Sequence, residues 1–287
     1  MPEIRVATVA DVDQVLELLE ARSRAAFGRS EVSRPFVEAE LRRSVDGRFV
    51  AEQGGHVVGY GHVRPTKDVV VAAGDATTAD ALLAQVEQHA RERGADVIEA
   101  TVVAEDVPFY ALVQRGGFVH DRDILRMWRV LDADVKEPTW PDGVALRTYE
   151  DADSEQVKTL LDDAYAWDAH YAPQSLEGWL AFMTDYDEFD PSLWFLVERD
   201  EELVACALHW KEHRRRGWLK DIAVHASERG AGLGKALVRH GLRAYAERGV
   251  ERVGLKVDAA NPTGAADLYA REGFVTDQHL EVWRKAL

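Results

Sequence analysis

The two halves of this 287-residue chain repeat one another weakly, and this repeat constrains the fold more than any other feature. Residues 5–19 align with residues 147–161, and each segment has the pattern of a short strand, an Asp near a helix start and an apolar helical period. The matched residues are Arg5, Asp11, Gln14, Val15, Leu18 and Leu19, and Arg147, Asp153, Gln156, Val157, Leu160 and Leu161. The halves also end alike, because F-Y-A-L-V-Q-R-G-G-F at 109–118 resembles D-L-Y-A-R-E-G-F at 267–274. A chain of this length accommodates two domains, so we expect tandem domains.

A linker is predicted at residues 135–143, V-K-E-P-T-W-P-D-G, where two prolines and a glycine interrupt both periodicities. We therefore expect an N-terminal domain over residues 1–134 and a C-terminal domain over residues 144–287. In the second half, apolar runs joined by short polar turns precede a strand–helix–strand–helix–strand series. This order predicts an α/β fold (α+β, with a mixed sheet), in which each domain has a central mixed β-sheet flanked by helices.

Composition argues against several classes of partner. A formal net charge of −16 argues against nucleic acids and anionic membranes. The sequence has no apolar signal core and no window long enough for a membrane-spanning helix, so we expect a cytoplasmic protein. The one cysteine, Cys206, lies in an apolar run and is expected to be a buried core thiol. No histidine or cysteine spacing suggests zinc, so no metal is expected.

Three glycines lie in the turn between a strand predicted at Trp218–Val224 and a helix predicted over about residues 233–248. The turn reads Arg229, Gly230, Ala231, Gly232, Leu233 and Gly234. Glycine allows backbone conformations that a Cβ forbids and lets a ligand approach the main chain closely. A helix N-terminus presents unpaired N–H groups and the positive end of a dipole. The segment therefore predicts a phosphate-binding turn.

This order of elements, with R-G-A-G-L-G after the fourth main strand, resembles the GNAT acetyltransferases. Arg229, Gly232 and Gly234 match the family fingerprint Gln/Arg-x-x-Gly-x-Gly/Ala. The resemblance implies that the backbone amides of the turn hold the pyrophosphate of acetyl-CoA, and that the preceding strand hydrogen-bonds the pantetheine arm. It also implies that the strands bearing Lys220–Val224 and Val253–Val257 separate to admit this cofactor.

A second segment, V-D-A-A-N-P-T-G-A-A-D-L-Y-A-R-E-G-F at 257–274, is similar to the family pattern Asn-x-x-Ala-x-x-Leu-Tyr-x-x-x-Gly-Phe. Asn261 and Tyr269 fall where the family has its cofactor-side Asn and its general-acid Tyr. A phenol with a pKa of about 10 keeps its proton at neutral pH and can give it to a departing thiolate. The alternative for Tyr269 is a core aromatic packed beneath the turn. The implied cofactor-binding residues are Ile222, Ala223, Val224, Arg229, Gly230, Ala231, Gly232, Leu233, Gly234 and Asn261.

Asp221 is the first candidate for the general base, because the family commonly has an acidic or water-bound base on the strand before the turn. Strand alternation predicts that its side chain lies on the face opposite Lys220 and Ile222. In the alternative interpretation Asp221 is a structural partner of Lys220, Lys256 or Arg252. Secondary candidates for the base are His209 and His225, and water is a further one.

Acidic and aromatic residues cluster after the first helix of the second half, where GNAT proteins shape the acceptor site. Such residues suit an ammonium-bearing substrate through charge and cation–π contact, although a solvated loop explains them nearly as well. The cluster comprises Asp162, Asp163, Tyr165, Trp167, Asp168, His170 and Tyr171, and the segment 184–190 adds more acid. The basic run H-R-R-R-G at 213–217 is interpreted as a solvated hairpin, with a clamp for the 3′-phosphate of CoA as the alternative.

The first half departs from the family pattern. Its corresponding stretch at 69–80 has one glycine, and Asp75 and Asp80 would face a pyrophosphate instead of neutralising it. Val113 stands where the second half has Tyr269. The first half is therefore expected to be a degenerate, non-catalytic GNAT domain.

These observations predict an acetyl-CoA-dependent N-acetyltransferase that moves an acetyl group to the primary amine of a small molecule or peptide, by direct attack in a ternary complex. The tandem arrangement resembles the actinobacterial two-domain GNAT proteins, of which mycothiol synthase is one type. A first alternative is therefore the acetylation of an amino-sugar thiol conjugate. A second alternative is a non-catalytic acyl-CoA-binding regulatory protein. The sequence specifies neither the acceptor nor the oligomeric state.

Overall fold

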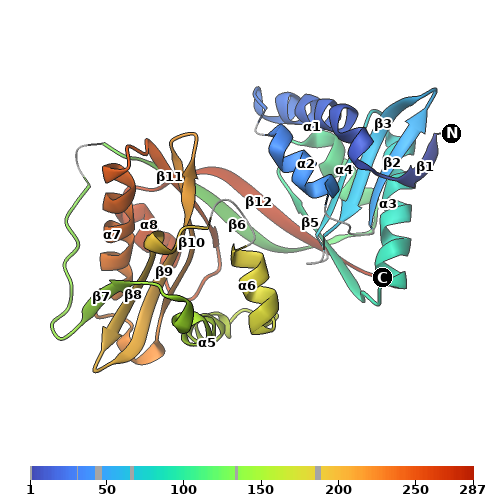
Figure 1. Ribbon diagram of the computed structural model, residues 1–287. Helices are drawn as coiled ribbons and strands as arrows, with labels where there is room; N and C mark the ends of the chain where they lie inside the picture. The colour runs from blue at the N-terminus through green and yellow to red at the C-terminus, as the bar shows by residue number, and fades with distance from the viewer. Residues whose placement is uncertain (1, 31, 43–46, 65–67, 133–134, 185–188) are drawn as a thin grey trace. The chain divides into compact units, whose positions relative to one another are not determined.

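The chain divides into two compact units (Figure 1). The structure is a computed structural model that describes residues 2–30, 32–42, 47–64, 68–132, 135–184 and 189–287. Unit 1 comprises Met1–Ile124 and Gln278–Leu287, and unit 2 comprises Leu125–Asp277. The two division points lie inside strands β6 (Val119–Val130) and β12 (Val275–Ala286). The contact division thus assigns the last ten residues to unit 1, whereas the independence of 1–134 and 144–287 as folding domains stays a prediction.

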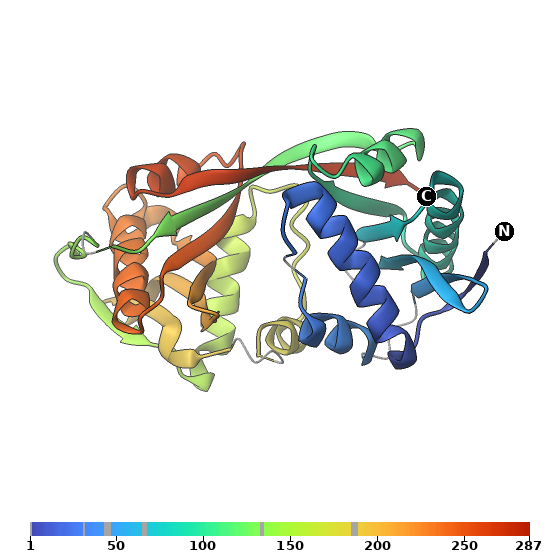
Figure 2. The same cartoon turned by 90° about the horizontal axis from the view of Figure 1, so that it is seen from above.

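Unit 1 contains a four-stranded antiparallel sheet in the order β1-β2-β3-β4. Its elements are β1 (Glu3–Val6), α1 (Val12–Phe27), α2 (Arg34–Arg42), β2 (Arg48–Gln53), β3 (His56–Val63), β4 (Val69–Ala73), α3 (Ala76–Glu92), β5 (Val97–Val102) and α4 (Val107–Arg115). Alternate residues of β2 face opposite sides: Phe49 and Ala51 pack with α3, while Val50 packs with α1 and α2. Figure 2 shows α1 and α3 on the two sides of this sheet.

The end of the chain belongs to the core of unit 1. The C-terminal part of β12 pairs antiparallel with β5, from Glu281↔Val102 to Ala286↔Val97. The Tyr110 hydroxyl donates to the Glu281 carboxylate at 2.9 Å. Unit 1 is therefore completed by a strand that follows all of unit 2 in the sequence.

Unit 2 contains a mixed sheet. Its elements are β7 (Ala145–Thr148), α5 (Ser154–Tyr165), α6 (Leu176–Thr184), β8 (Trp194–Arg199), β9 (Glu202–His213), β10 (Arg216–Val224), α7 (Leu233–Glu247), β11 (Arg252–Asp258) and α8 (Ala265–Arg271). The strand order is β6-β11-β10-β9-β8-β7, with β10 and β11 parallel and the pairs among β7, β8, β9 and β10 antiparallel. The predicted mixed sheet flanked by helices is confirmed in unit 2, whereas the four-stranded sheet of unit 1 is antiparallel.

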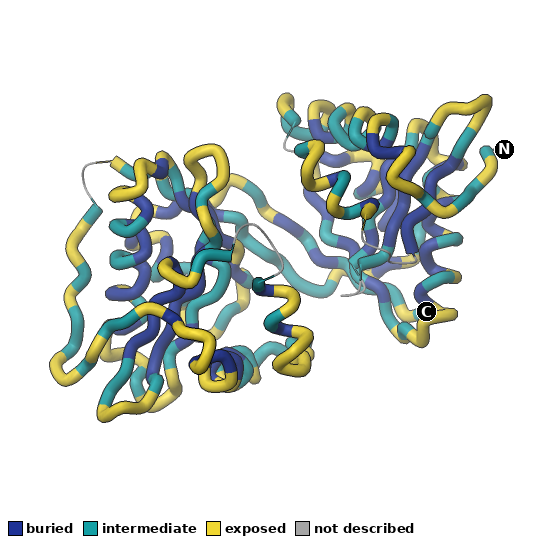
Figure 3. The backbone as a smooth tube through the Cα atoms, viewed as in Figure 1, coloured by how far each residue is buried: buried dark blue, intermediate teal, exposed yellow. Residues whose placement is uncertain are grey.

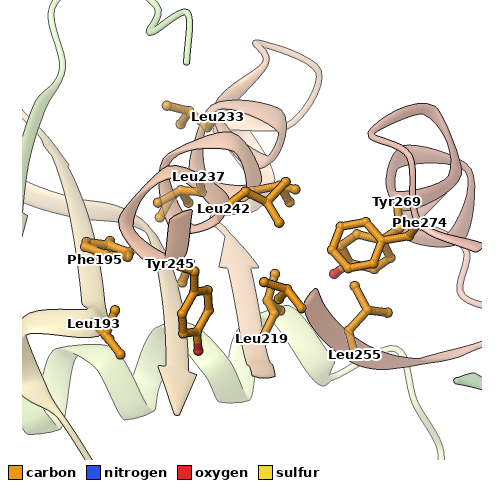
Figure 4. Close-up of a cluster of buried hydrophobic side chains, with 14 of the residues drawn as sticks. Leu193, Phe195, Leu219, Leu233, Leu237, Leu242, Tyr245, Leu255, Tyr269 and Phe274 are labelled. Atoms are coloured by element: carbon orange, nitrogen blue, oxygen red, sulfur yellow. The ribbon is translucent and has the colours of Figure 1, made fainter. Parts of the chain in front are cut away.

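Helices cover both faces of the unit 2 sheet. Leu233, Leu237 and Leu242 of α7 are buried against one face, together with Tyr269 and Phe274 (Figure 4). The other face packs against α5 and α6 and includes Cys206, which is fully buried, as predicted. Strands β8 and β9 are buried over most of their length (Figure 3), because both faces of this sheet are covered.

The repeated Arg and Asp make the same interaction in both units. Arg5 holds both carboxylate oxygens of Asp11 at 2.7 and 2.9 Å, and Arg147 holds both oxygens of Asp153 at 2.6 and 2.7 Å. Each Asp precedes the first long helix of its unit. The weak sequence repeat therefore reflects a repeated structure. Among the described residues, no helix has the length and apolar character required to cross a membrane.

Candidate active site

The turn between β10 and α7 ends in a glycine at the N-cap of the helix. Gly230 and Gly232 have φ values of +81° and +95°, in the left-handed region that favours glycine. A Cβ at either position would have nothing within 4 Å, so backbone conformation, not crowding, requires these glycines. Gly232 is the N-cap of α7, and it supplies no capping side chain. The first N–H groups of α7 are therefore available to an anion.

Strand β10 separates from β11 before it reaches this turn. The parallel ladder comprises Arg216↔Arg252, Gly217↔Val253 and Trp218↔Gly254, and it ends there. Because the His225 amide donates to Val204 across the β9–β10 pair, alternation directs the amide and carbonyl of Ile222 away from β9. We call this open side of residues 219–224 the β10 edge. The early end of this ladder agrees with the predicted separation of β10 from β11.

A β-bulge at Lys220 corrects the expected position of Asp221. Leu219 pairs with His209 and Asp221 pairs with Leu208, so Lys220 is an extra residue in β10. Simple alternation, which predicted opposite faces for Lys220 and Asp221, was wrong. Their side chains meet, with Lys220 Nζ donating to Asp221 Oδ2 at 3.0 Å. The other carboxylate oxygen of Asp221 accepts from the Tyr165 hydroxyl at 3.1 Å.

Asp221 lies in the wall of a pocket of about 110 Å³ between α5, α6 and β10. The pocket is lined by Lys158, Leu161, Tyr165, Tyr171, Ala172, Gln174, Trp179, Phe182, Met183, Lys220 and Asp221. The rings of Tyr165 and Tyr171 stack with their centroids 5.4 Å apart. Burial, followed by the charge of Asp221, raises the pKa of Tyr165 well above its ordinary value. Tyr165 therefore acts as a hydrogen-bond donor to the carboxylate at neutral pH.

Tyr269 is buried on α8, with its ring packed edge-on against Phe274 (Figure 4). Burial, and then the nearby Asp221 charge, raise the pKa of its phenol. Such a phenol keeps its proton at neutral pH, as a general acid must before transfer. Its packing also matches the alternative of a core aromatic, so the catalytic role stays a prediction.

The remaining predicted cofactor residues surround the turn. The Arg229 side chain folds back, with Nε donating to the Val224 carbonyl at 3.2 Å. Asn261 Oδ1 accepts from the Thr263 amide at 2.9 Å and so shapes the turn before α8. Leu233 is buried at the start of α7, and Ala223 is buried in β10. The structure thus brings the turn, the β10 edge, Asp221 and Tyr269 together in unit 2, while their cofactor contacts stay predictions.

Several other candidates lie away from this site. The Arg215 guanidinium donates to the Gly249 carbonyl, beyond the last residue of α7. It is therefore about 22 Å along the helix axis from the turn, which argues against the clamp for a 3′-phosphate. His209 is buried, and neither of its ring nitrogens has a hydrogen-bond partner within the part of the chain that the structure describes, while His225 caps a short turn at Ser227. Neither histidine lines the pocket.

The acidic cluster after α5 is only partly in the pocket. Tyr165 and Tyr171 line it, whereas Asp163, Trp167, Asp168 and His170 do not. Residues 185–188 of the predicted acidic segment lie outside the described residues. Sequence reasoning missed Lys158, Trp179 and Phe182. The sequence repeat could have indicated Lys158, because this lysine aligns with Leu16 on a helix face that is otherwise apolar.

Unit 1 fills the corresponding positions with its own side chains. The Asp75 carboxylate caps α3 by accepting from the Thr78 amide at 2.9 Å, and Asp80 accepts from Arg115. Arg22 donates to Asp106 at 2.5 Å and to the Val71 carbonyl at 3.0 Å.

The Val71 carbonyl is the unit 1 counterpart of the β10 edge. Because the Arg64 amide donates to Asp68 and the Gly74 amide to Val58, alternation directs this carbonyl away from β3. Among the described residues, its side of β4 joins β5 through an isolated parallel bridge, Asp68↔Glu99. Arg22 therefore occupies the edge position that corresponds to Ile222, whereas in unit 2 Arg229 donates to the Val224 carbonyl, two residues further along the edge. Among the described residues, no group of His, Cys, Asp and Glu has the arrangement of a metal site.

Comparison with solved structures identifies the fold. A GCN5-related N-acetyltransferase from Sphaerobacter thermophilus superposes with a TM-score of 0.80 at 24% identity, covering 99% of this chain and 95% of that one. A tandem GNAT protein from the clavulanic acid biosynthesis pathway superposes with a TM-score of 0.78 at 18% identity, covering 100% and 98%. These likenesses define a tandem GNAT fold.

Sequence comparison gives the family. Residues 155–274 match the model of the Acetyltransferase (GNAT) family. The mycothiol acetyltransferase of Streptomyces coelicolor is 31% identical over 292 residues, covering 94% of this chain and 90% of that protein. The mycothiol acetyltransferase of Thermomonospora curvata is 30% identical over 279 residues, covering 93% and 91%. The chain belongs to the GNAT acetyltransferase family and is an acyltransferase, as the sequence predicted.

Proposed function

We propose that unit 2 transfers an acetyl group from acetyl-CoA to a primary amine, and that unit 1 is non-catalytic. The observation that carries this proposal is the glycine N-cap of α7 beside the β10 edge. Backbone N–H groups at such a helix start bind pyrophosphate, and a free strand edge hydrogen-bonds an extended amide-bearing arm. Unit 1 has a carboxylate at the first position and a guanidinium at the second.

The reaction proceeds by direct attack of a neutral amine in a ternary complex. Cys206 is fully buried, and burial raises the pKa of its thiol, so this side chain does not serve as an acyl carrier. The acceptor amine forms a bond to the thioester carbonyl carbon as it loses a proton. The carbon–sulfur bond then breaks, and Tyr269 donates its proton to the departing thiolate of CoA.

Asp221 is the proposed proton acceptor, because it is the carboxylate that lines the pocket. Lys220 and Tyr165 fix its orientation, and each donates one hydrogen bond to a different carboxylate oxygen. A carboxylate has about four lone-pair sites, so acceptor capacity remains for the amine or an intervening water.

The full-length relatives named mycothiol acetyltransferase support a mycothiol-type amine as the acceptor. The test is to profile amines with acetyl-CoA, including the amino-sugar thiol conjugate and simple alkylamines of similar reactivity. A preference of about 100-fold or more in kcat/KM for the conjugate supports this acceptor. Equal rates for all amines contradict it, and acetyl-CoA binding without turnover on any amine supports a regulatory binding protein instead.

The role of Tyr269 is tested by Tyr269→Phe, which removes only the hydroxyl. We expect kcat to fall about 100-fold while the Kd for acetyl-CoA changes little, because only proton transfer is lost. Wild-type kcat across the pH range would assign Tyr269 to the core alone.

A further inference from the structure

We propose that Lys158 determines acceptor specificity by binding a carbonyl or carboxylate oxygen close to the reacting amine. This inference rests on the proposed function of unit 2 and names the chemical class of acceptor that its pocket takes.

Lys158 stands where the fold does not require a charge. It is 6% exposed on α5, between the buried apolar residues Val157, Leu160 and Leu161. The repeat aligns it with Leu16, which packs with the apolar core around α1 in unit 1. Burying an ammonium costs several kcal/mol unless it is paired, and the first unit shows that an apolar residue suits this position. The lysine therefore serves the pocket that it lines.

The ammonium is held in place by a hydrogen-bonded carboxylate. Lys158 Nζ lies 2.6 and 2.5 Å from the two oxygens of Asp162, and the Tyr171 hydroxyl donates to Asp162 at 2.5 Å. An ammonium has three N–H donors, and Asp162 takes two of them. We assign the third to an oxygen atom of a bound acceptor.

The same combination of residue types recurs on the opposite side of the pocket. Lys220 donates to Asp221, which also accepts from Tyr165, and the Tyr165 ring stacks on Tyr171. Each carboxylate is thus neutralised by a lysine. The polar groups that line the pocket thus include two lysine ammonium groups, the acceptor capacity left on Asp221 and the carboxamide of Gln174.

This arrangement changes the predicted type of acceptor. The acidic residues of the sequence suggested a site for an ammonium-bearing substrate. In the structure the two acids are already paired, and two lysines line the pocket. A second cationic group on the acceptor would be repelled, whereas a carboxamide or carboxylate beside the amine would find a donor. We therefore infer an α-amino amide or α-amino acid type of acceptor.

The test compares alaninamide with 2-aminobutane, which have similar size but differ in the carboxamide. The variant Lys158→Met is measured alone and combined with Asp162→Asn, because the double variant leaves no unpaired carboxylate. We expect the ratio of kcat/KM for alaninamide over 2-aminobutane to fall about tenfold or more in both variants, through a higher KM for alaninamide. Lys158→Gln keeps an N–H donor and should restore part of the ratio.

A ratio that stays within about twofold of wild type in both variants overturns the assignment. Binding is measured in parallel by calorimetry, with each amine titrated into the wild type and the double variant in the presence of CoA. If no acetyl transfer to any amine occurs, the proposed function fails. The binding difference between alaninamide and 2-aminobutane then still tests Lys158.

Discussion

Units 1 and 2 share a fold and a repeated Arg–Asp pair, but they differ at the start of one helix and along one strand edge. In unit 2 the N-cap of α7 is Gly232, which supplies no capping side chain, and the pairing of β10 with β11 ends at Trp218↔Gly254. In unit 1 Asp75 caps α3, and Arg22 covers the corresponding edge at Val71. The protein's own carboxylate and guanidinium thus satisfy the backbone groups that we propose bind pyrophosphate and pantetheine in unit 2. Side chains of the protein can therefore take the place of a ligand on the backbone while the fold is retained.

The strands preceding these helices differ as well. Strand β4 pairs with β3 without interruption from Gly59↔Ala73 to Val63↔Val69, whereas β10 has a bulge at Lys220. The register places Val70 of unit 1 at the position of Asp221. The charged residue Asp221 in the pocket wall is therefore specific to unit 2, because unit 1 has the apolar Val70 at the matching position.

The largest effect is expected from Arg22→Ala, which removes the guanidinium that donates to the Val71 carbonyl at the strand edge of unit 1. Asp106 is 5% exposed, and the variant leaves it buried without this ion pair. We expect a loss of about 3–5 kcal/mol in the free energy of unfolding, measured by urea denaturation. Asp106→Asn in the same background should recover part of it. A loss below about 1 kcal/mol would mean that Arg22 does not hold unit 1 together.

Gly232→Val should abolish most activity in unit 2. The left-handed φ of +95° disfavours valine, so the turn would move and its N–H groups would no longer converge. We expect kcat/KM for acetyl-CoA to fall about 100-fold. The matched variant Asp75→Ala removes the cap of α3 and should cost about 1 kcal/mol of stability with acetyl transfer unchanged. A large activity loss in Asp75→Ala would contradict the assignment of catalysis to unit 2.

A smaller, pH-dependent effect is expected from a buried histidine in each unit. Burial lowers the pKa of both His62 and His209 from 6.5 to about 3. Because the unfolded chain binds the extra protons, stability falls as the pH drops below about 6.5, by about 2 kcal/mol per histidine at about pH 5. Urea denaturation at about pH 7.5 and pH 5 should show a smaller pH-dependent loss in His62→Leu and His209→Leu. An unchanged loss in either variant would exclude that histidine as its source.

The smallest effect is expected in the hairpin between β8 and β9. Glu201 has a φ of +67°, whereas the matching hairpin of unit 1 has Gly55 at +80°. A left-handed conformation costs a non-glycine residue about 1–2 kcal/mol, and glycine loses about 0.5–1 kcal/mol in chain entropy. Glu201→Gly should therefore stabilise the protein by about 0.5 kcal/mol, and Gly55→Ala should destabilise it. Thermal denaturation checks both, and a lower Tm for Glu201→Gly would contradict the strain.

Local patterns predicted much of the second unit. The strand expected at Trp218–Val224 is β10, Arg216–Val224, and the helix expected over about 233–248 is α7, Leu233–Glu247. These elements follow from periodicity and turn glycines, which are properties of neighbouring residues. Helix α8 begins at Ala265, after the turn in which Asn261 Oδ1 accepts from the Thr263 amide.

The features that sequence could not supply depend on distant residues. The bulge at Lys220 is visible only in the register with β9, and the pairing of β12 with β5 joins segments about 180 residues apart. The pocket combines helix, loop and strand residues whose proximity no local pattern encodes. Of the three pocket residues that sequence reasoning missed, Lys158, Trp179 and Phe182, the first had a sequence signal, a charge at a repeat position that is otherwise apolar.

The assignment of Gln278–Leu287 to unit 1 has a consequence for biosynthesis. A ribosome completes β5 long before it makes β12, because all of unit 2 (residues 125–277) is translated in between. At about 5–20 residues per second this interval lasts roughly 8–30 s. During that time β5 lacks its partner strand, and an unpaired edge is a template for aggregation. The first unit to be synthesised is therefore the last to be finished.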